Sequence, residues 1–413
     1  MFPPPPPWSR HVFSVGVTGT NGKTTTTTYL ASALACGVWG EGRRRRPEAP
    51  NVKPEHAPVL RVTTVGSFLG PDKLHVEPDY DGFVAAMQRA RAAGAKHAVL
   101  ECTSEALAAG FAKAWPISMG VFTNLTRDHL DSHGSPEHYL ASKAQLFVHL
   151  PSDGVAILNG YDPASALLAE VIPAGVRIVA YGLPSRSSLP PVLPVDITAE
   201  YVHVAWDGTT VKLRTSDFQG EMHLQAIGEV YAENALAALA AAIAAGVSSR
   251  DAVEAIARTP PVAGRFEVIG GGPRAVIDYG HSPDALARTL ATARALCKGR
   301  LTVVFGAGGG RDRGKRAAMG QASRIADEIV LTSDNPRHED PAMIAAEIRV
   351  GIAEHSAVRV ILDREEAIEN ALQAAGIEDV VVIAGRGPET QQISASGQRH
   401  LVDAEIARRV LQA

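Results

Sequence analysis

A short glycine turn near the start of the chain constrains the fold more than any other feature. An apolar run over Val12–Val17 predicts a buried strand, and the sequence Thr18-Gly-Thr-Asn-Gly-Lys-Thr24 follows it directly. A helical pattern then begins at Thr25 and continues to about Ala35. A strand, a glycine turn and a helix N-terminus in that order place successive backbone N–H groups around an anion. This order is typical of a phosphate loop in an α/β domain.

The side chains of the turn indicate a nucleoside triphosphate site. We expect Lys23 to meet the β- and γ-phosphates and Thr24 to bind Mg²⁺. The spacing departs from the usual phosphate-loop pattern, because position 17 is Val where that pattern has Gly. A glycine turn that only joins a strand to a helix is the alternative, and the adjacent Lys and Thr argue against it.

The rest of the chain alternates between strand and helix patterns. Its 413 residues exceed what one hydrophobic core usually organises. Residues 196–225 alternate as antiparallel strands do, and the α/β pattern restarts after Pro260-Pro261. Alternating strands and helices with short connections predict parallel sheets. We therefore expect an α/β protein with two domains: a central phosphate-loop ATPase domain with a mainly parallel sheet at 1–263, and a C-terminal Rossmann-like α/β domain at 264–413.

Composition and charge exclude several classes of protein. Forty Lys and Arg against 44 Asp and Glu leave a net charge of −4, which does not favour nucleic acid or an anionic membrane as a partner. Three widely separated cysteines form neither a disulfide framework nor a four-thiolate zinc site. The N-terminus has no signal-peptide pattern. The longest apolar run, Ala235–Val247, is too short to span a bilayer and predicts a buried alanine-rich helix. We expect a cytoplasmic protein.

Three further residues are candidates for a metal and phosphate site. Glu101 ends an apolar strand, which is where a parallel sheet presents ligand residues. His129 follows another apolar strand, and its imidazole suits a second metal position. Lys143 fits the pattern of an ordinary helical lysine, and its own segment gives no reason to assign it a role. An acid at a strand end is often only a helix cap or a surface charge, so none of the three is decisive alone.

Ten short segments, in order along almost the whole chain, resemble one known family when they are taken together. They are Thr18-Gly-Thr-Asn-Gly-Lys-Thr-Thr25, Glu101-Cys-Thr-Ser104, residues 123–134, Tyr139–Phe147, Asn234-Ala-Leu-Ala237, Gly264-Arg-Phe-Glu267, Asp278–Leu286, Phe305–Gly320, Ser333-Asp-Asn-Pro-Arg337 and Ile383-Ala-Gly-Arg-Gly-Pro-Glu-Thr390. This set is similar to the Mur ligase superfamily of ATP-dependent amide-forming ligases. It most closely resembles the MurE branch, the UDP-N-acetylmuramoyl-tripeptide synthetases.

The resemblance implies roles for the nucleotide and metal residues. Nucleotide binding would involve Gly19, Thr20, Asn21, Gly22, Lys23, Thr24, Thr25, Asn234, Arg265, Asp278 and His281. Two Mg²⁺ ions would be held by Thr24, Glu101, His129 and Lys143, with Lys143 carrying a carbamate formed from CO2. The carbamate turns a cation into an oxygen ligand suited to Mg²⁺. The implied catalytic residues are Lys23, Lys143, His129 and Glu101, acting in phosphoryl transfer from ATP to a carboxylate and then attack of an amine on the acyl phosphate.

The C-terminal segments indicate the amine substrate. Asp334-Asn-Pro-Arg337 matches the signature of family members that add meso-diaminopimelate, where the arginine pairs with the distal carboxylate. The resemblance assigns the amino-acid pocket to Arg311, Asp334, Asn335, Arg337, Gly385 and Glu389. Two family motifs are altered, to Gly385-Arg-Gly-Pro-Glu389 and Gly308-Gly-Gly-Arg-Asp312. We expect a diaminopimelate-like amino acid with a second carboxylate or similar polar end; an Asn-Pro turn that only caps a strand is the alternative.

Departures from the family also gather on the side of the acceptor carboxylate. The family's Thr-Thr-Pro is Val76-Glu77-Pro78, a histidine is Glu105, and a Gln and an Arg that meet the muramyl-peptide are Ala109 and Phe111. MurE enzymes also carry an N-terminal UDP-binding domain, for which we expect no room before the phosphate loop. We therefore expect a ligase that joins an amino acid to an acceptor carboxylate without a UDP group.

Other functions stay open. A true UDP-MurNAc-dipeptide:meso-diaminopimelate ligase and a non-catalytic ATP-binding relative are both alternatives. An amidating subunit of the MurT type is excluded, because that branch has a four-cysteine zinc element and this chain has three cysteines. We expect a small carboxylic acid and an amino acid as partners, no nucleic acid or membrane, and a monomer or homodimer.

Overall fold

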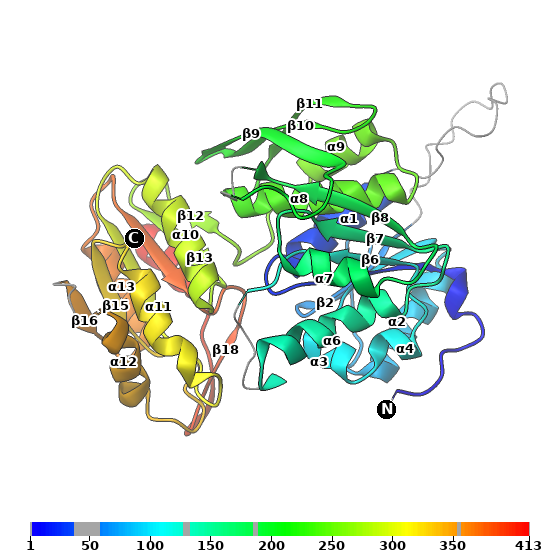
Figure 1. Ribbon diagram of the computed structural model, residues 1–413. Coiled ribbons are helices and arrows are strands. Elements are labelled where there is room, and N and C mark those ends of the chain that lie inside the picture. Colours follow the sequence, from blue (N-terminus) through cyan, green and yellow to red (C-terminus); the bar gives the residue numbers. More distant parts are fainter. Residues whose placement is uncertain (1, 37–57, 127–132, 185–188, 353–356, 413) are drawn as a thin grey trace.

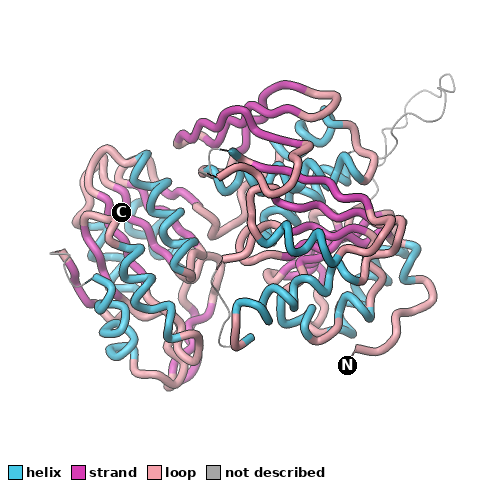
Figure 2. The backbone as a smooth tube through the Cα atoms, viewed as in Figure 1, coloured by secondary structure: helices cyan, strands magenta, loops and turns pink. Residues whose placement is uncertain are grey.

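The chain folds into two lobes, each built around its own β-sheet. The computed structural model describes residues 2–36, 58–126, 133–184, 189–352 and 357–412. Figure 1 shows the N-terminal lobe with the larger sheet and the C-terminal lobe beside it. Figure 2 shows strands between layers of helices in both lobes. The larger sheet ends in chain order at Leu224 and the smaller one begins at Glu267; the division at residue 263 stays a prediction.

The sheet of the N-terminal lobe has the strand order β11-β10-β9-β8-β7-β6-β1-β5-β2-β3-β4. Its strands are β1 (Phe13–Thr18), β2 (Leu60–Thr63), β3 (Gly66–Leu69), β4 (Asp72–Leu74), β5 (His97–Glu101), β6 (Met119–Phe122), β7 (Val155–Asn159), β8 (Arg177–Gly182), β9 (Ile197–Ala205), β10 (Gly208–Arg214) and β11 (Gln219–Leu224). In the order of the sheet, the strands β9-β8-β7-β6-β1-β5-β2 pair in parallel. Strands β10 and β11 add to one edge and β3 and β4 to the other, all four by antiparallel pairing. The predicted mainly parallel sheet is confirmed.

Helices cover both faces of this sheet because its central strands are apolar on both sides. These helices are α1 (Lys23–Cys36), α2 (Tyr80–Ala92), α3 (Ser104–Ala108), α4 (Phe111–Ala114), α6 (Pro136–Val148), α7 (Ala164–Val171), α8 (Glu229–Ala244) and α9 (Ser249–Ala257), after a 3₁₀ turn at Ser9–His11. In β5, Val99 packs in the core with α1 and α8, and Leu100 packs in the core with α2 and α6. Parallel strands are usually buried in this way. Ala235–Ala242 are buried in α8, so the predicted alanine-rich helix is confirmed.

The C-terminal lobe is a six-stranded sheet in the order β12-β13-β17-β14-β15-β16. Its strands are β12 (Glu267–Ile269), β13 (Arg274–Asp278), β14 (Leu301–Phe305), β15 (Glu328–Leu331), β16 (Val358–Val360) and β17 (Val380–Ala384), followed by the hairpin β18 (Gln391–Ser394) and β19 (Gly397–His400). Its helices are α10 (Pro283–Leu296), α11 (Arg316–Ser323), α12 (Pro341–Arg349), α13 (Arg364–Gln373) and α14 (Asp403–Gln412), with 3₁₀ turns at Arg313–Lys315 and Val350–Ile352. Within the six-stranded sheet, all strands except β12 pair in parallel, whereas β18 and β19 pair antiparallel with each other; the parallel sheet confirms the predicted second α/β unit.

Several short elements are not indicated by the sequence pattern. Strands β2 to β4 extend one edge of the larger sheet, and the β18–β19 hairpin stands apart from the smaller one. Every residue of β19 is exposed, so its sequence carries none of the apolar alternation that predicts a strand. Among the helices that the structure describes, none is long and apolar enough to cross a membrane.

Candidate active site

The phosphate loop lies between β1 and α1 and depends on two glycines. Gly19 and Gly22 have φ angles of +148° and +87°, a backbone conformation that favours glycine. A Cβ on Gly19 would collide with the Thr123 hydroxyl, and a Cβ on Gly22 would collide with the Asn234 carboxamide. Helix α1 begins at Lys23, directly after the loop. The loop therefore ends at a helix N-terminus, which favours an anion.

Lys23 and Thr24 begin helix α1 and make different contacts. The Lys23 Nζ donates to the carbonyl oxygens of Gly19 and Thr20, at 3.2 and 2.8 Å, so the ammonium lies over the loop. The Thr24 Oγ1 donates to Glu101 Oε2 at 2.9 Å. Glu101 is at the carboxyl end of β5, which is the parallel neighbour of β1. The structure thus brings the predicted phosphate and metal residues to one place, while their roles stay predictions.

The pair of Thr24 and Glu101 fits a Mg²⁺ ion. A hydroxyl and a carboxylate are hard oxygen donors, and Mg²⁺ is usually held by one or two carboxylates together with substrate phosphates and water. The backbone N–H of Thr64 also donates to Glu101 Oε2, at 3.3 Å, which helps to fix the carboxylate. Within the described residues, no three His, Cys, Asp or Glu side chains gather as a ready-made metal cage. The donor set is therefore that of a metal bound together with phosphate.

Lys143 is buried although its position on the helix gives no sign of this. Its side chain is 1% exposed on α6. The Nζ donates to the carbonyl oxygen of Gly19 at 2.8 Å and lies 4.1 Å from the centre of the Tyr139 ring. The interpretation as an ordinary helical lysine is therefore wrong, because the side chain reaches the phosphate loop. His129, the other predicted ligand of a second metal ion, lies outside the described residues.

The C-terminal lobe forms one wall of a cavity at the phosphate loop. This cavity, of about 240 Å³, is lined by the phosphate loop and also by Asn234, Arg265, Asp278 and His281. The Arg265 guanidinium lies 4.3 Å from the centre of the Tyr279 ring. The structure therefore gathers the predicted nucleotide residues of both lobes around one cavity.

Asp278 is a buried carboxylate that accepts three hydrogen bonds near the start of the C-terminal lobe. Its carboxylate accepts from the backbone N–H groups of Phe266, at 2.9 Å, and Gly280, at 2.8 Å, and from the Thr289 hydroxyl at 2.8 Å. Burial raises the pKa of the Asp278 carboxyl. Phe266 has a φ of +48°, which is unusual for a residue with a side chain. The hydrogen bonds to Asp278 thus hold the backbone in a strained conformation beside the site.

A contact through Asp284, which sequence reasoning missed, joins the lobes. The Asn21 Nδ2 of the phosphate loop donates to Asp284 Oδ2 at 3.2 Å, and Arg288 Nε donates to the same carboxylate at 2.8 Å. Asp284 and Arg288 both lie on α10. The one signal for Asp284 is its position in the first turn after Ser282-Pro283, and that pattern predicts only a helix start.

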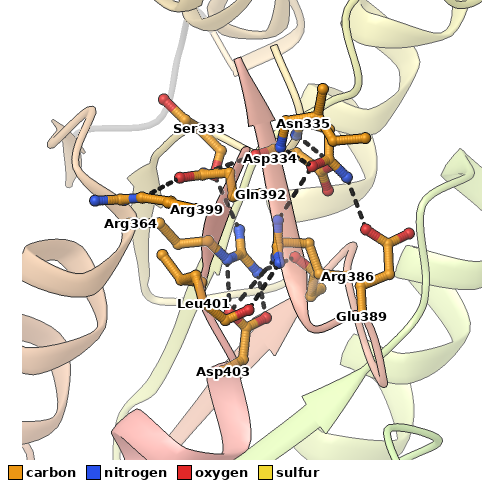
Figure 3. Close-up of polar contacts among 12 residues, drawn as sticks. Ser333, Asp334, Asn335, Arg364, Arg386, Glu389, Gln392, Arg399, Leu401 and Asp403 are labelled. Atoms are coloured by element: carbon orange, nitrogen blue, oxygen red, sulfur yellow. Dashed lines mark hydrogen bonds and ion pairs between the residues drawn. The ribbon is translucent and has the colours of Figure 1, made fainter. Parts of the chain in front are cut away.

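The predicted amino-acid residues follow the carboxyl ends of β14, β15 and β17 in the C-terminal lobe. Figure 3 shows three of them, Asp334, Asn335 and Glu389. The Asn335 Nδ2 donates to Glu389 Oε2 at 2.7 Å. A Cβ on Gly385, whose φ is +112°, would lie 2.5 Å from Asp334 Oδ2, so this position needs glycine. Burial, and then the nearby Asp334 carboxylate, raise the pKa of Glu389. Two acids therefore lie close together in a setting that a bound cation would relieve.

Two predicted arginines flank the glycine loop after β14. The Arg337 Nη1 donates to the carbonyl oxygen of Gly309 at 2.7 Å. A Cβ on Gly308 would lie 3.1 Å from Arg337 Nη1 and 3.6 Å from Arg311 Cγ, so both side chains reach this loop. Arg337 has a φ of +53°, which again marks a strained backbone at the site.

A buried ionic cluster supports this pocket, and sequence reasoning missed it. Arg364, Arg386 and Asp403 are each 0% exposed. Arg364 donates to both Asp403 oxygens, from Nε at 2.8 Å and from Nη2 at 2.7 Å. Arg386 donates from Nη1 to Asn335 Oδ1 at 3.2 Å (Figure 3). The sequence shows Arg386 only as a departure from a family motif; its contact with Asn335 ties the cluster to the acid pair.

Comparison with known proteins agrees with this arrangement. Residues 17–242 match the Mur ligase middle domain, and residues 264–387 match the Mur ligase, glutamate ligase domain. A UDP-N-acetylmuramoyl-L-alanyl-D-glutamate–2,6-diaminopimelate ligase of Vibrio vulnificus (strain YJ016) is 36% identical over 404 residues, which cover 96% of this chain and 76% of the relative. The enzyme of the same name from Thermosynechococcus vestitus is 37% identical over 408 residues, covering 98% and 77%.

A solved structure of similar name agrees as well. A UDP-N-acetylmuramoyl-L-alanyl-D-glutamate–2,6-diaminopimelate ligase superposes with a TM-score of 0.64 at 31% identity, covering 97% of this chain and 78% of its own. The two lobes of this chain thus match two consecutive domains of one family. The N-terminal lobe holds the phosphate loop, and the C-terminal lobe holds the predicted amino-acid residues. This chain belongs to the Mur ligase family and is an ATP-dependent acid–amino-acid ligase, similar to the MurE branch.

Proposed function

We propose that this ligase joins an amino acid that carries a second carboxylate to an acceptor carboxylic acid without a UDP group. The observation that carries the amino-acid side is the arrangement in the C-terminal lobe. Asp334 and Glu389 lie together on one side, and Arg311 and Arg337 reach the glycine loop at the next strand end. The ammonium of an amino acid would pair with Asp334 and Glu389, and its distal carboxylate would pair with the guanidinium groups of Arg311 and Arg337.

The reaction begins with phosphoryl transfer in the cavity around the phosphate loop. A carboxylate oxygen of the acceptor attacks the γ-phosphorus of ATP, the bond to the β–γ bridging oxygen breaks, and ADP leaves. Lys23 and the α1 N-terminus hold the phosphates, and Arg265 lies across the cavity in the other lobe. Positioning and charge neutralisation supply most of the rate in such transfers.

The amide then forms at the acyl phosphate. The amine nitrogen attacks the acyl carbon, phosphate leaves with the electrons of the C–O bond, and the ammonium proton is released. Glu389 and Asp334 hold the amino group at the carboxyl edge of the C-terminal sheet. Because the cavity is walled by both lobes, water is kept from the acyl phosphate while both substrates are bound.

Mg²⁺ and a carbamate belong to this proposal. Thr24 and Glu101 would hold one Mg²⁺, and His129 with a carbamate on Lys143 would hold a second; when bound, the metal neutralises phosphate charge. The burial of Lys143 supports the carbamate, because it places the Lys143 nitrogen against the phosphate loop, beside the residues proposed to hold the phosphates.

One assay tests the proposed function directly. The full chain is incubated with ATP, Mg²⁺, a panel of acceptor acids and a panel of amino acids, and ADP and product mass are followed. We expect ADP release that depends on both substrates and a product equal to acid plus amine minus water. ADP release that depends on neither substrate, or no turnover across both panels, would support a non-catalytic ATP-binding relative instead.

The second candidate function follows from the comparisons. Relatives at 36% and 37% identity are named as UDP-N-acetylmuramoyl-L-alanyl-D-glutamate–2,6-diaminopimelate ligases, so that nucleotide-linked dipeptide is a second candidate acceptor. Efficient turnover of UDP-N-acetylmuramoyl-L-alanyl-D-glutamate with diaminopimelate would establish this candidate and reject the altered acceptor. The amino-acid side is tested separately, because Arg337→Lys should raise the KM for diaminopimelate more than the KM for an amino acid with one carboxylate.

A further inference from the structure

A second cavity adjoins the nucleotide cavity and differs from it in chemistry. It has a volume of about 230 Å³, and Glu101 lines both cavities. Aromatic rings form much of its wall: Phe2, Tyr80, Phe83 and Phe111. The rings contact one another, with centroids 5.2 Å apart for Phe83 and Phe111 and 5.0 Å apart for Phe2 and Tyr80. The cavity is therefore lined mainly by apolar and aromatic side chains.

The charges around this pocket restrict what it can bind. Among the described residues that line it, the charged side chains are Asp79 and Glu101, and none is Lys, Arg or His. Asp79 is already engaged, since its Oδ1 accepts from the Gly82 N–H at 2.8 Å as the N-cap of α2. Anionic groups such as phosphates or extra carboxylates need cationic or N–H partners when they are buried. The pocket thus suits an uncharged, apolar group.

The position of the pocket fixes the orientation of its ligand. Glu101 ends β5, and its Oε2 accepts from the Thr24 hydroxyl beside the phosphate loop. Leu100 and Cys102, on either side of Glu101, line the aromatic pocket. A molecule with an apolar body in this pocket would present its other end at Glu101, where the γ-phosphate and Mg²⁺ of the proposed function meet.

We propose that the aromatic pocket binds the body of the acceptor, and that the acceptor is a monocarboxylic acid with an aryl or alkyl chain. This inference rests on the proposed function and specifies its acceptor. A dry apolar cavity of roughly 150 Å³ takes up benzene in an engineered protein, so a pocket of about 230 Å³ has room for a phenyl ring or a short acyl chain. The acid loses no atoms in binding; its carboxylate oxygen takes the γ-phosphoryl group and ADP leaves, as above.

The test uses hydroxylamine in place of the amino acid, so that the identity of the amine does not matter. The full chain is given ATP, Mg²⁺, hydroxylamine and either 3-phenylpropanoate, hexanoate or succinate, and the acyl hydroxamate is measured. We expect hydroxamate from the first two acids and at least about tenfold lower kcat/KM with succinate, whose second carboxylate has no partner in the pocket. Equal or better use of succinate would overturn the inference.

Variants of the pocket separate binding from folding. Phe111→Ala should raise the KM for 3-phenylpropanoate by about tenfold and leave the KM for ATP unchanged, because a contacting ring is removed. Phe111→Leu should recover most of the affinity. Phe218→Ala is the matched control, since Phe218 is also half-buried in this lobe but does not line the pocket. Equal effects of Phe111→Ala and Phe218→Ala would contradict the assignment.

A binding measurement keeps the pocket testable even if no acid is turned over. Trp115 lies against Phe83, with centroids 4.8 Å apart, so 3-phenylpropanoate in the pocket should change tryptophan fluorescence. Saturable binding that is weakened in Phe111→Ala, without hydroxamate from any acid, would reject the proposed function and retain the pocket. Hydroxamate from UDP-N-acetylmuramoyl-L-alanyl-D-glutamate alone, with no fluorescence change on adding 3-phenylpropanoate, would reject the pocket and retain a ligase.

Discussion

Replacement of Asp403 by Asn should strongly destabilise the C-terminal lobe. Asp403 is the buried carboxylate to which Arg364 donates two hydrogen bonds, and Arg386 Nε lies 3.9 Å from its Oδ1. All three side chains are 0% exposed. Asn has the same shape but no charge. The substitution therefore leaves two guanidinium groups buried beside each other without their counter-ion.

The magnitude follows from the distances. At an effective dielectric constant of about 20, a charge pair at 2.7–2.8 Å attracts by about 6 kcal/mol and one at 3.9 Å by about 4 kcal/mol. Much of this attraction offsets the cost of removing the charges from water. Breaking a buried pair by removing one partner typically costs about 3–5 kcal/mol. We therefore expect Asp403→Asn to lower the free energy of unfolding of this lobe by about 3–5 kcal/mol.

The assay must report on the C-terminal lobe by itself, because two lobes need not unfold in one step. Native-state hydrogen exchange of the backbone amides of β17 measures the local free energy of opening. The control is Glu369→Gln, which removes one carboxylate from the exposed pair with Arg409. We expect less than about 1 kcal/mol for this control. An Asp403→Asn effect within about 1 kcal/mol of the control would refute the reasoning that the cluster depends on its carboxylate.

Three further changes give distinct outcomes. Gly22→Ala should weaken ATP binding by at least about a hundredfold, because the added Cβ collides with Asn234. The control Gly70→Ala, at φ +59° with open space around it, should cost only the backbone strain of about 1 kcal/mol and bind ATP normally. Equal ATP affinities of the two variants by calorimetry would contradict this. Lys143→Ala should lower hydroxamate formation by about 100- to 1,000-fold and abolish a ¹³C carbamate signal. The exposed control Lys113→Ala should leave both unchanged. Burial and Asp334 raise the pKa of Glu389, so the folded protein disfavours the charged carboxylate. Glu389→Gln should therefore stabilise the unliganded protein at pH values above the raised pKa, and this gain should disappear as the pH falls through that pKa. The same variant should raise the KM for the amino acid by about tenfold or more. A destabilising effect at neutral pH in chemical unfolding would show that the Asn335 contact outweighs burial.

The parts of the fold that the sequence predicts are those determined by local pattern. The apolar strand, glycine turn and helix at 12–35 appear as β1, the loop and α1, because each is specified by neighbouring residues. Glu101 could be placed because parallel strands present their carboxyl ends at one edge. Thr24 is predicted from the phosphate-loop motif, and the pairing of β1 with β5 brings it to Glu101.

The residues that sequence reasoning missed act through contacts between distant segments. Arg364 and Asp403 are 39 positions apart, and Arg386 reaches Asn335 across 51 positions. Lys143 is indicated through the family resemblance alone: it is separated from Gly19 by 124 positions, and its helix pattern does not show that its side chain points to the loop. Nothing near Asp284 indicates that Asn21 will meet it from the other lobe. Single-sequence periodicity reports burial along one element, and it carries no information about which partner covers that element.

This difference explains why the chemistry of the ligase is easier to predict than its substrates. The nucleotide half depends on a short loop, whose glycines and lysine must be adjacent to one another in the chain. The aromatic pocket is lined by residues of β2, β5, α2, α3, α4 and the segment around Phe2, none of which is informative alone. Phe111 shows the point most clearly: in the sequence it is one unmatched residue, whereas in the structure its ring packs on Phe83 beside the carboxylate that reaches Thr24. Substrate choice therefore has to be read from which side chains meet, and here the ones that meet are apolar.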